Sequence, residues 1–489
     1  MNPRLPPLLA ALFLVGLSPL SAAPEPSETT GVVKVRVTSQ AHDFLRPWLK
    51  KAPATREAVG AVLSGNRVLV TAELVANHNF VEIEHPDSGE KSAAIVRAVD
   101  YDANIALVEP SGKSFLPRIR ALALADEPGT GDTVQAVQFE STGSPMRTPL
   151  TLTTVEVGPY PVSDMALLLY RLSGSLQYRD GSFALPLLSE GKLVGIVMRY
   201  DPRTQAADAI SSPVIRKFLA GVARNATGIF PRAGVAYAPT RDPQLRKFLG
   251  LENGAGGVLV TFIDPRGPAA EAGIEKGDVL VDIQGERIDQ DGNFAHPRHG
   301  RISLSHLIST ADEKEMPFRL LRNGESKIVS VKPRPRPPTE SISPPHQLDS
   351  APRYLVSGGL VFQELGRQFL REWGASWDKR APQRLLYLDR FQHELYPEGN
   401  RRIVFLSHVL PSPATIGYEH LSQLVVTRVN GRDIRSLEDL DAALAAPVDG
   451  FQKFELDGEP HQIVLDQAEA EKVTPALQRH YGVTELKRL

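Results

Sequence analysis

The 489-residue chain contains no cysteine, which excludes disulfide bonds and thiolate metal sites. Acidic and basic side chains almost cancel, with a net charge of −2, so the excess positive charge typical of nucleic-acid-binding proteins is missing. Gly-rich phosphate loops are also missing. His296 and His299 lie three residues apart in HPRHG, where the intervening Pro and Arg favour a solvated loop over metal ligation. We therefore expect no nucleic-acid partner, no metal and no cofactor.

Long apolar runs are scarce, and the one of interest lies at the N-terminus. Residues 1–23 combine one basic residue, an apolar stretch and the small residues Ser21-Ala22-Ala23, an order typical of a secretory signal peptide cleaved after Ala23. Three prolines and the shortness of the apolar stretch argue against the alternative, a membrane anchor. We expect a secreted or periplasmic protein with no membrane span after cleavage.

Short strand-like runs dominate the segment from about 30 to 225. Examples are GVVKVRV, RVLVTAEL and KLVGIVM, and the runs recur roughly every ten residues between turn-forming residues. This spacing predicts an all-β barrel or sandwich. The segment SPVIRKFLAGVARN then predicts a closing helix, capped by Ser211 or Ser212 and with Pro213 in its first turn.

Two further units follow, separated by a proline-rich stretch. In the unit at 230–333, expected strands at Val258–Ile263 and Asp278–Ile283 flank a short helix that Gly273 closes. Seven prolines in residues 333–352 predict a semi-rigid linker. The unit at 353–489 repeats the strand–turn–helix order: a strand at Val425–Val429, a turn at Asn430-Gly431, and a helix capped by Ser436.

Three segments resemble the catalytic segments of HtrA/Deg-type serine proteases, in the same order. They are VGAVLSGNRVLVTAELV at 59–75, DYDANIALV at 100–108 and DGSFALP at 180–186, the last followed by GKLVGIVM. The resemblance implies a trypsin-like fold in which Glu73 stands at the histidine position, Asn104 at the aspartate position and Ser182 at the nucleophile position. A triad needs a base that holds a proton near neutral pH and a group that orients it. Glutamate ionises about two units lower than histidine, and Asn104 carries no charge to stabilise a protonated base.

The same resemblance implies damage to the oxyanion hole. Asp180 stands where the family has the glycine whose N–H binds the oxyanion, and a carboxylate there repels developing negative charge. Phe183 and Ala184 replace the two glycines after the serine. The loss of a single oxyanion donor costs roughly 10²–10³ in rate. The combined losses indicate a site without useful activity, in which Ser182 is a turn residue.

An acidic catalytic set remains as the alternative. Ser182, Glu73 and either Asp180 or Asp102 can form a Ser–Glu–Asp arrangement in which buried carboxyls with raised pKa values work at low pH. In this case the chain is an active serine endopeptidase with an altered site.

The unit at 230–333 resembles the PDZ domains of HtrA proteases, on GPAAEAGI and KGDVLVDIQG. The unit at 353–489 resembles the divergent second PDZ domain of plant-type Deg proteases, on YLVSGGLVF, LSHVL and VNG. The first resemblance implies a peptide groove whose carboxylate loop is Arg232-Ala233-Gly234-Val235, with a pocket helix near Ser303–Ile308. Arg232 is either an attractor for the ligand's carboxylate or a plain surface residue. In the second, only the segment 358–361 offers a carboxylate loop.

The predicted fold is therefore mainly β, a trypsin-like double β-barrel followed by two PDZ-like α+β domains. Its expected parts are a signal peptide (1–23), a degenerate protease domain (30–225), PDZ domain 1 (230–333), a Pro-rich linker (334–352) and a divergent PDZ domain 2 (353–489). The expected function is a pseudoprotease that binds peptides or protein C-termini through PDZ domain 1, as scaffold, regulator or chaperone-like binder. The family resemblance also implies a homotrimer. An exposed Phe or Tyr cluster near the mature N-terminus would support it, and only Phe44 and Trp48 stand there.

Overall fold

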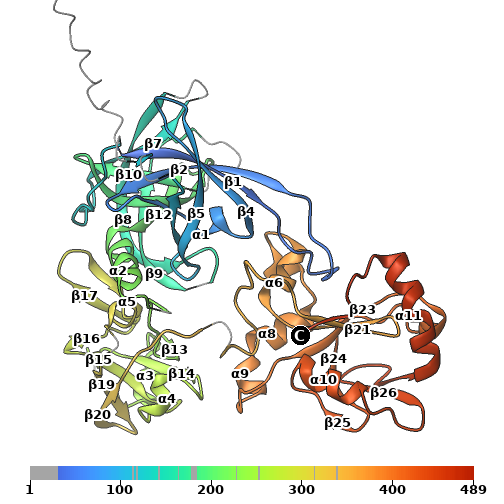
Figure 1. Cartoon of the computed structure of the whole chain (residues 1–489). Helices are drawn as coiled ribbons and strands as arrows, with labels where there is room; N and C mark the ends of the chain where they lie inside the picture. Colours follow the sequence, from blue (N-terminus) through green and yellow to red (C-terminus); the bar gives the residue numbers. More distant parts are fainter. Residues whose placement is uncertain are drawn as a thin grey trace, which may run out of the picture.

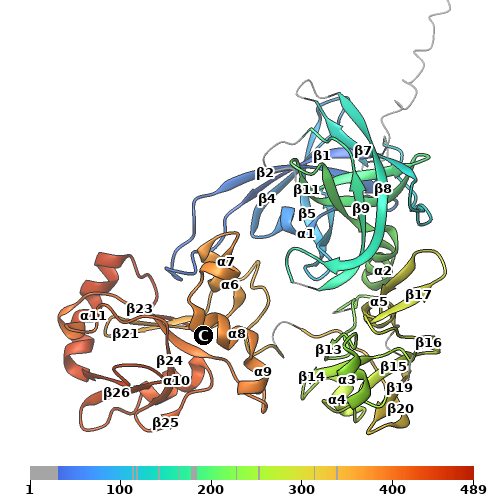
Figure 2. The same ribbon diagram turned by 180° about the vertical axis from the view of Figure 1, so that it is seen from behind.

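The computed structural model describes residues 31–112, 115–116, 119–140, 144–163, 165–177, 184–226, 228–251, 254–312, 314–337 and 340–489. The predicted signal peptide lies outside the described residues. Figures 1 and 2 show a double-barrel domain, a second domain below it, and a third domain to one side. The domain boundaries expected from the sequence stay predictions, but the elements fall into these three groups.

Two closed six-stranded barrels form the first domain. The first barrel has the order β1 (Val32–Ser39), β2 (Ala54–Leu63), β3 (Arg67–Val70), β6 (Ile105–Pro110), β5 (Lys91–Asp100), β4 (His78–Glu84). The second has the order β10 (Leu185–Ser189), β11 (Lys192–Asp201), β12 (Ala206–Ser211), β9 (Ala166–Ser173), β8 (Pro145–Pro159), β7 (Thr133–Phe139). The buried side chains of the two barrels belong to one hydrophobic core. The strand β6, for example, buries nearly every side chain. The short helix α1 (Ala72–Val75) follows β3.

The predicted closing helix is present as α2 (Ser212–Ala223), with Pro213 in its first turn. The expected capping bond is absent, because the Ser211 side chain donates instead to the carbonyl of Leu168 at 2.8 Å. Ser211 is therefore committed to the barrel and not to the helix.

The second domain is a sheet with a separate hairpin. Its sheet order is β13 (Val235–Ala238), β14 (Val258–Ile263), β15 (Val279–Ile283), β19 (Met316–Arg322), β20 (Glu325–Val331), and β16 (Glu286–Arg287) pairs with β15. The remaining elements are α3 (Pro243–Phe248), α4 (Pro268–Glu271), the hairpin β17 (Asn293–His296)–β18 (Gly300–Ser303), and α5 (Ser305–Thr310). The short helix closed by Gly273 is confirmed, since Gly273 has a φ of +77° that favours glycine.

The third domain has a larger sheet with an insertion of short helices. Its sheet order is β27 (Gln462–Asp466), β26 (Phe451–Leu456), β24 (Leu424–Val429), β23 (Val404–Val409), β22 (Leu360–Glu364), β21 (Tyr354–Ser357), β28 (Lys487–Arg488), and β25 (Arg432–Asp433) pairs with β24. The helices are α6 (Arg367–Leu370), η3 (Arg371–Trp373), α7 (Trp377–Arg380), α8 (Gln383–Arg390), α9 (Gln392–Leu395), η4 (Pro413–Thr415), α10 (Leu437–Leu444) and α11 (Gln467–Tyr481). The Ser436 cap is confirmed by the bond from the Asp439 N–H to its hydroxyl at 3.2 Å.

The segment expected as a linker packs against all three domains. Arg334 pairs with Arg232 through their backbones, with N–H to O distances of 2.9 and 3.3 Å. Ile342 is fully buried, and Asp349 accepts from the N–H of Asn77 at 2.6 Å. The semi-rigid linker stays a prediction, and in its described part apolar and acidic side chains contact the neighbouring domains.

The loop between β1 and β2 reaches the third domain, as Figure 2 shows. Phe44 and Trp48 are buried there; the Trp48 indole donates to the carbonyl of Tyr481 at 3.0 Å, and Gln363 donates to that of Phe44 at 3.0 Å. Lys51 adds an ion pair with Glu372 at 2.7 Å. Phe44 and Trp48 are thus engaged within the chain, which removes the sequence argument for a trimer.

The β17–β18 hairpin packs against the double-barrel domain through histidines. His299 is almost fully buried and hydrogen-bonds Glu127 of the first domain, and His296 stacks on it with ring centroids 4.7 Å apart. His306 of α5 approaches His296 at 5.6 Å. The expectation of a solvated HPRHG loop is wrong, because the imidazoles are packed into an interface. Among the described residues no group of three or more ligand-type side chains fits a metal ion.

Acidification should loosen this interface. Burial lowers the pKa of His306 to about 4; His296 and His299 add to this, while Glu127 opposes it. Because the folded state favours neutral His306, stability is complete above about pH 6.5 and is lost as the pH falls toward 4, by about 2 kcal/mol at pH 5. The melting temperature should therefore drop less between pH 7.5 and 5 in His306→Phe than in the unsubstituted chain. Equal drops would contradict this, and exposed His420→Phe is the matched control.

Removal of the Trp48 indole should release the third domain from the loop. Trp→Ala at a buried contact costs about 3–5 kcal/mol, and here that loss falls on one interface. We expect Trp48→Ala to speed hydrogen exchange in residues 40–53 and in α11 while the barrels stay protected. The control is Leu45→Ala in the same loop, where the side chain is exposed; similar exchange in both variants would contradict the docking.

Candidate functional site

Glu73 and Asn104 form a reciprocal hydrogen-bonded pair between the two loops of the first barrel. The Asn104 side-chain Oδ1 accepts from the Glu73 backbone N–H at 3.0 Å, and its Nδ2 donates to Glu73 Oε2 at 2.9 Å. Asn104 is fully buried and has a φ of +52°, a left-handed conformation that asparagine tolerates better than most residues. The backbone carbonyl of Asn104 also accepts from the N–H of Ala72 at 3.1 Å. The structure therefore brings together the two positions that the sequence singled out.

The polarity of this pair is the reverse of a histidine–aspartate pair. In a triad the imidazole N–H donates and the carboxylate accepts, which leaves the other ring nitrogen free to take a proton. Here the carboxylate of Glu73 accepts and the amide of Asn104 donates. The two substitutions compensate one another in hydrogen bonding, and they remove the charge that would stabilise a protonated base.

Electrostatics at Glu73 work in opposite directions. Burial raises the pKa of Glu73, while the bond from Asn104 and the positive charges of Arg56, Arg371 and Arg199 lower it. Arg56 also donates to the Glu73 backbone carbonyl at 2.6 Å. The three arginines lie far from Glu73 in sequence, and no spacing signal could have identified them beforehand.

Asp102, a candidate orienting residue of the alternative triad, is engaged elsewhere. Its carboxylate forms an ion pair with Arg232 of the second domain at 3.0 Å. The loss of water around the carboxyl of its neighbour Asp100, which is half-buried, and the charge of Asp102 raise the pKa of Asp100 to about 7. The sequence left Arg232 as either an attractor for a ligand carboxylate or a plain surface residue, and the structure shows its side chain bound to Asp102.

Ser182 and Asp180, together with Phe183, lie outside the described residues. Ala184, the next residue, is described: it is buried and its carbonyl accepts from the N–H of Val59 at 3.2 Å. The chain after the nucleophile position is thus tied to the first barrel.

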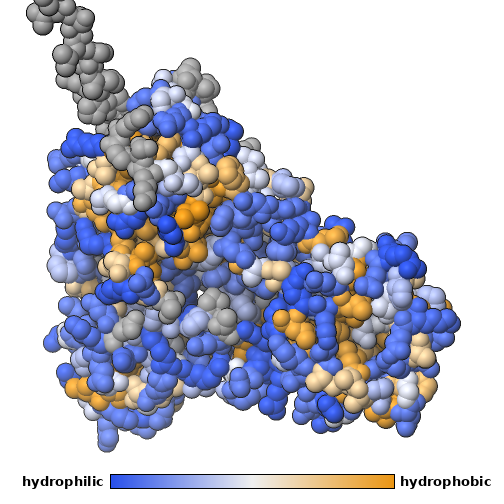
Figure 3. All heavy atoms as spheres, viewed as in Figure 1, coloured by the Kyte–Doolittle hydropathy of each residue, from blue (hydrophilic) through white to orange (hydrophobic). Residues whose placement is uncertain are grey.

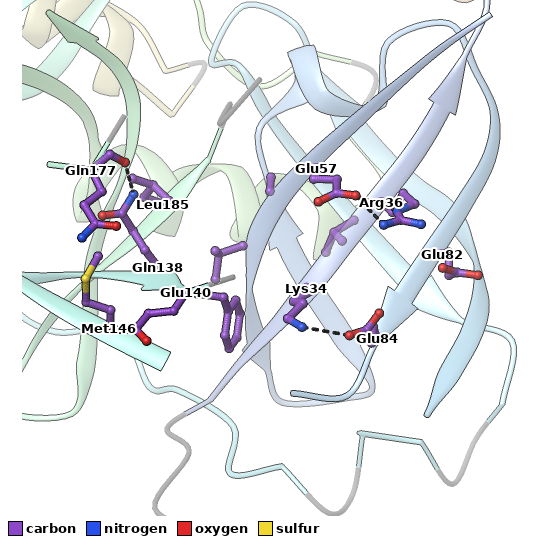
Figure 4. A pocket seen from close by; sticks show the side chains of 14 residues that line it. Lys34, Arg36, Glu57, Glu82, Glu84, Gln138, Glu140, Met146, Gln177 and Leu185 are labelled. Carbon is purple, nitrogen blue, oxygen red and sulfur yellow. Dashed lines mark hydrogen bonds and ion pairs between the residues drawn. The ribbon is translucent and has the colours of Figure 1, made fainter. Parts of the chain in front are cut away.

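A hollow of about 280 Å³ is lined by residues of both barrels (Figure 4), and neither Glu73 nor Asn104 is among its lining residues. Its charged walls are largely paired: Lys34 contacts Glu84 at 2.9 Å and Arg36 contacts Glu57 at 2.8 Å. The hollow shows no concentration of unpaired charge that would indicate a catalytic role.

The second domain offers an open sheet edge beside a helix. β13 is the terminal strand of its sheet and pairs only with β14 among the described strands, and α5 covers the pocket position expected from the sequence. The loop Arg232–Val235 leads directly into β13, and Gly234 has a φ of +75°. Within the described residues the N–H groups of Ala233 and Gly234 donate no hydrogen bond. Free N–H groups at the start of an open edge are what β-strand addition and carboxylate capture require.

This edge opens into a cavity of about 620 Å³ that all three domains surround. The second domain contributes the loop, β13 and α5, including Val235 and Ile308. Met165 of the first domain and Arg367 and His393 of the third domain also line the cavity. A ligand strand here would touch every domain of the chain.

The third domain repeats the order of the second, but its equivalent edge is filled. The order β22-β23-β24-β26-β27 matches β13-β14-β15-β19-β20, with β25 on β24 as β16 is on β15. β21 pairs antiparallel with β22 through the turn at Gly358-Gly359, and α10 contacts both strands. The candidate carboxylate loop at 358–361 is therefore a hairpin turn, because the chain itself supplies the added strand.

Comparison with known proteins agrees with this architecture. The PDZ domain family matches residues 343–487, the third domain. The chain is similar to the "Putative protease Do-like 3, mitochondrial" of Arabidopsis thaliana, 24% identical over 446 residues, which covers 91% of this chain and 77% of that one. It is 25% identical over 460 residues to the "Protease Do-like 2, chloroplastic" of the same plant, which covers 92% and 74%.

Solved structures show the same fold. A serine-to-alanine form of the HtrA-type protease AlgW with a decapeptide matches with a TM-score of 0.50 at 16% identity, over 63% of this chain and 95% of that one. The predicted fold class, a mainly β trypsin-like fold followed by PDZ architecture, is confirmed.

The compensation between Glu73 and Asn104 can be tested by a double substitution. Asn104→Asp places a second carboxylate against Glu73 and removes the donor, which should cost about 1–3 kcal/mol at pH 7.5. Addition of Glu73→His to this variant restores a donor–acceptor pair, and we expect the melting temperature to recover. If the double variant is as unstable as the sum of the single ones, the pair is not a coupled unit.

Proposed function

Because the chain belongs to the HtrA/Deg-type serine protease family and carries a PDZ domain, we propose that it is a pseudoprotease that binds protein C-termini. The observation that carries the proposal is the contrast between the two sites. The catalytic positions hold a mutually satisfied Glu73–Asn104 pair, while the β13 edge presents unsatisfied N–H groups in a large cavity.

The binding site is the groove of the second domain. A peptide added to β13 would place its terminal carboxylate at the N–H groups of Ala233 and Gly234. A Cβ at Gly234 would lie 3.1 Å from the Cα of Gly267 and 3.2 Å from the Cβ of Asp264, so the loop is closely packed against its neighbours. Arg232 would have to serve both Asp102 and the incoming carboxylate.

The third domain serves as a fixed support in this proposal. Its own edge is occupied by β21, and it holds the β1–β2 loop through Phe44 and Trp48. The chain would then act as scaffold, regulator or chaperone-like binder in protein quality control. Export by the N-terminal signal belongs to the same proposal. Assembly as a homotrimer does too, but it rests on the family resemblance alone, since Phe44 and Trp48 are buried within the chain.

The face of the molecule in Figure 3 is largely hydrophilic, with smaller hydrophobic patches. Over the described residues, every helix is too short or too polar to cross a membrane.

An active serine endopeptidase is the second candidate function. The raised pKa of Glu73 favours it, since a carboxyl that ionises nearer neutrality is a better base. Asn104 opposes it: the amide donor lowers the pKa of Glu73 and occupies Oε2.

Peptide binding tests the proposal directly. We expect fluorescence polarisation to detect binding of C-terminal peptides with a free carboxylate and at least tenfold weaker binding of their amides. Gly234→Ala should abolish binding because the added Cβ meets Gly267 and Asp264. Gly273→Ala is the matched control, since its φ is also positive, at +77°, but its Cβ would meet open space. Equal binding of acids and amides would contradict the proposal.

A further inference from the structure

A third and much smaller hollow lies next to the loop Arg232–Val235, where the second domain meets the segment that leads to the third. Its volume is about 60 Å³. Four arginines line it, Arg232 and Arg266 from the domain and Arg334 and Arg336 from the following segment, with Asp264 and Glu340 as the acidic residues. Like charges repel, and carboxylates offset part of this repulsion: Asp264 pairs with Arg336, Glu271 with Arg334 and Asp102 with Arg232.

Two of the arginines, Arg334 and Arg336, are held in place by carboxylates. Arg334 makes a two-pronged pair with Glu271 at 2.7 Å, and Arg336 bonds Asp264. These ion pairs fix the planes of the Arg334 and Arg336 guanidinium groups.

The other two arginines keep unused donors. Arg266 donates to the backbone carbonyl of Glu340 at 2.7 Å, and in the described part of the chain no carboxylate pairs with it. Arg232 uses one terminal nitrogen on Asp102, and its Nε is buried with no acceptor among the described residues. A buried charged donor without an acceptor is destabilising, and a bound anion would remove that penalty.

Charges of both signs act on Arg336 beside the hollow. Burial lowers the pKa of Arg336, and the charges of Arg266 and Arg232 lower it further, while Asp264 and Glu340 oppose them. A neighbouring positive charge that disfavours protonated arginine also favours an incoming anion.

Size and geometry narrow the ligand. The volume holds a few water molecules and is too small for a peptide. The planar guanidinium fork matches two oxygens of a phosphate group. We propose that this hollow binds a phosphate group, either inorganic phosphate or a phosphate monoester, and thereby joins Arg232 and Arg266 to Arg334 and Arg336. Phosphate would then stiffen the connection between the second and third domains. The proposal does not depend on the peptide-binding function.

Thermal unfolding in HEPES at pH 7.5 tests it, with potassium phosphate or glycerol 3-phosphate compared against potassium chloride at equal ionic strength. We expect 10 mM phosphate to raise the melting temperature by about 2–4 °C. Arg266→Gln should lose this rise, and Arg266→Lys, which keeps the charge without the fork, should retain only part of it. Arg428→Gln is the matched control, since Arg428 pairs with Asp433 on the exposed surface of the third domain.

Each outcome decides the question. Stabilisation by both ligands supports a site open to phosphorylated molecules, and stabilisation by inorganic phosphate alone supports a closed one. The proposal is overturned if neither ligand exceeds the chloride control, or if Arg266→Gln responds as fully as Arg428→Gln does. It is also overturned if acetate stabilises equally and a C-terminal peptide displaces it, because the hollow is then the carboxylate site of the groove.

Discussion

A carboxylate can only accept hydrogen bonds, and this constraint organises the site around Glu73. Once a glutamate stands on α1 of the first barrel, partly removed from water, it needs a donor where a triad has an acceptor. Asn104 supplies that donor and, through Oδ1, still holds the backbone of α1 as an aspartate would. Under the proposed function, the barrel geometry is preserved while the direction of proton transfer is lost, so a trypsin-like fold persists without a working triad.

The same loop connects the site to the rest of the molecule. Asp102, two residues before Asn104, pairs with Arg232, which begins the binding loop of the second domain. Tyr101 bonds Asp349 and contacts His346 in the segment before the third domain, with ring centroids 5.2 Å apart. A region that in a protease would orient a base here serves as a joint between domains. The family's architecture is retained, and its former catalytic loop has a structural use.

The sequence predicted the parts of the fold that depend on local patterns. Strand alternation, Gly273 and the Ser436 cap act within a few residues, and the structure confirms them. The errors arose where distant segments meet. The HPRHG loop looked solvated because Glu127 lies far away in sequence, and Phe44 and Trp48 looked available because the third domain that buries them begins some 300 residues later. At the site, the pairing of Glu73 with Asn104 followed from the resemblance, but the link from Asp102 to Arg232 had no sequence signal.

If Glu73 and Asn104 have taken the places of the catalytic histidine and aspartate, the chain should not cleave proteins, and an assay with an unfolded protein measures this. Casein would be incubated with the purified chain and with Ser182→Ala from pH 4 to 8, and peptide release measured. The account predicts no difference between the two proteins at any pH. Cleavage that is present in the unsubstituted chain and absent in Ser182→Ala would contradict it and would make Glu73 the candidate base.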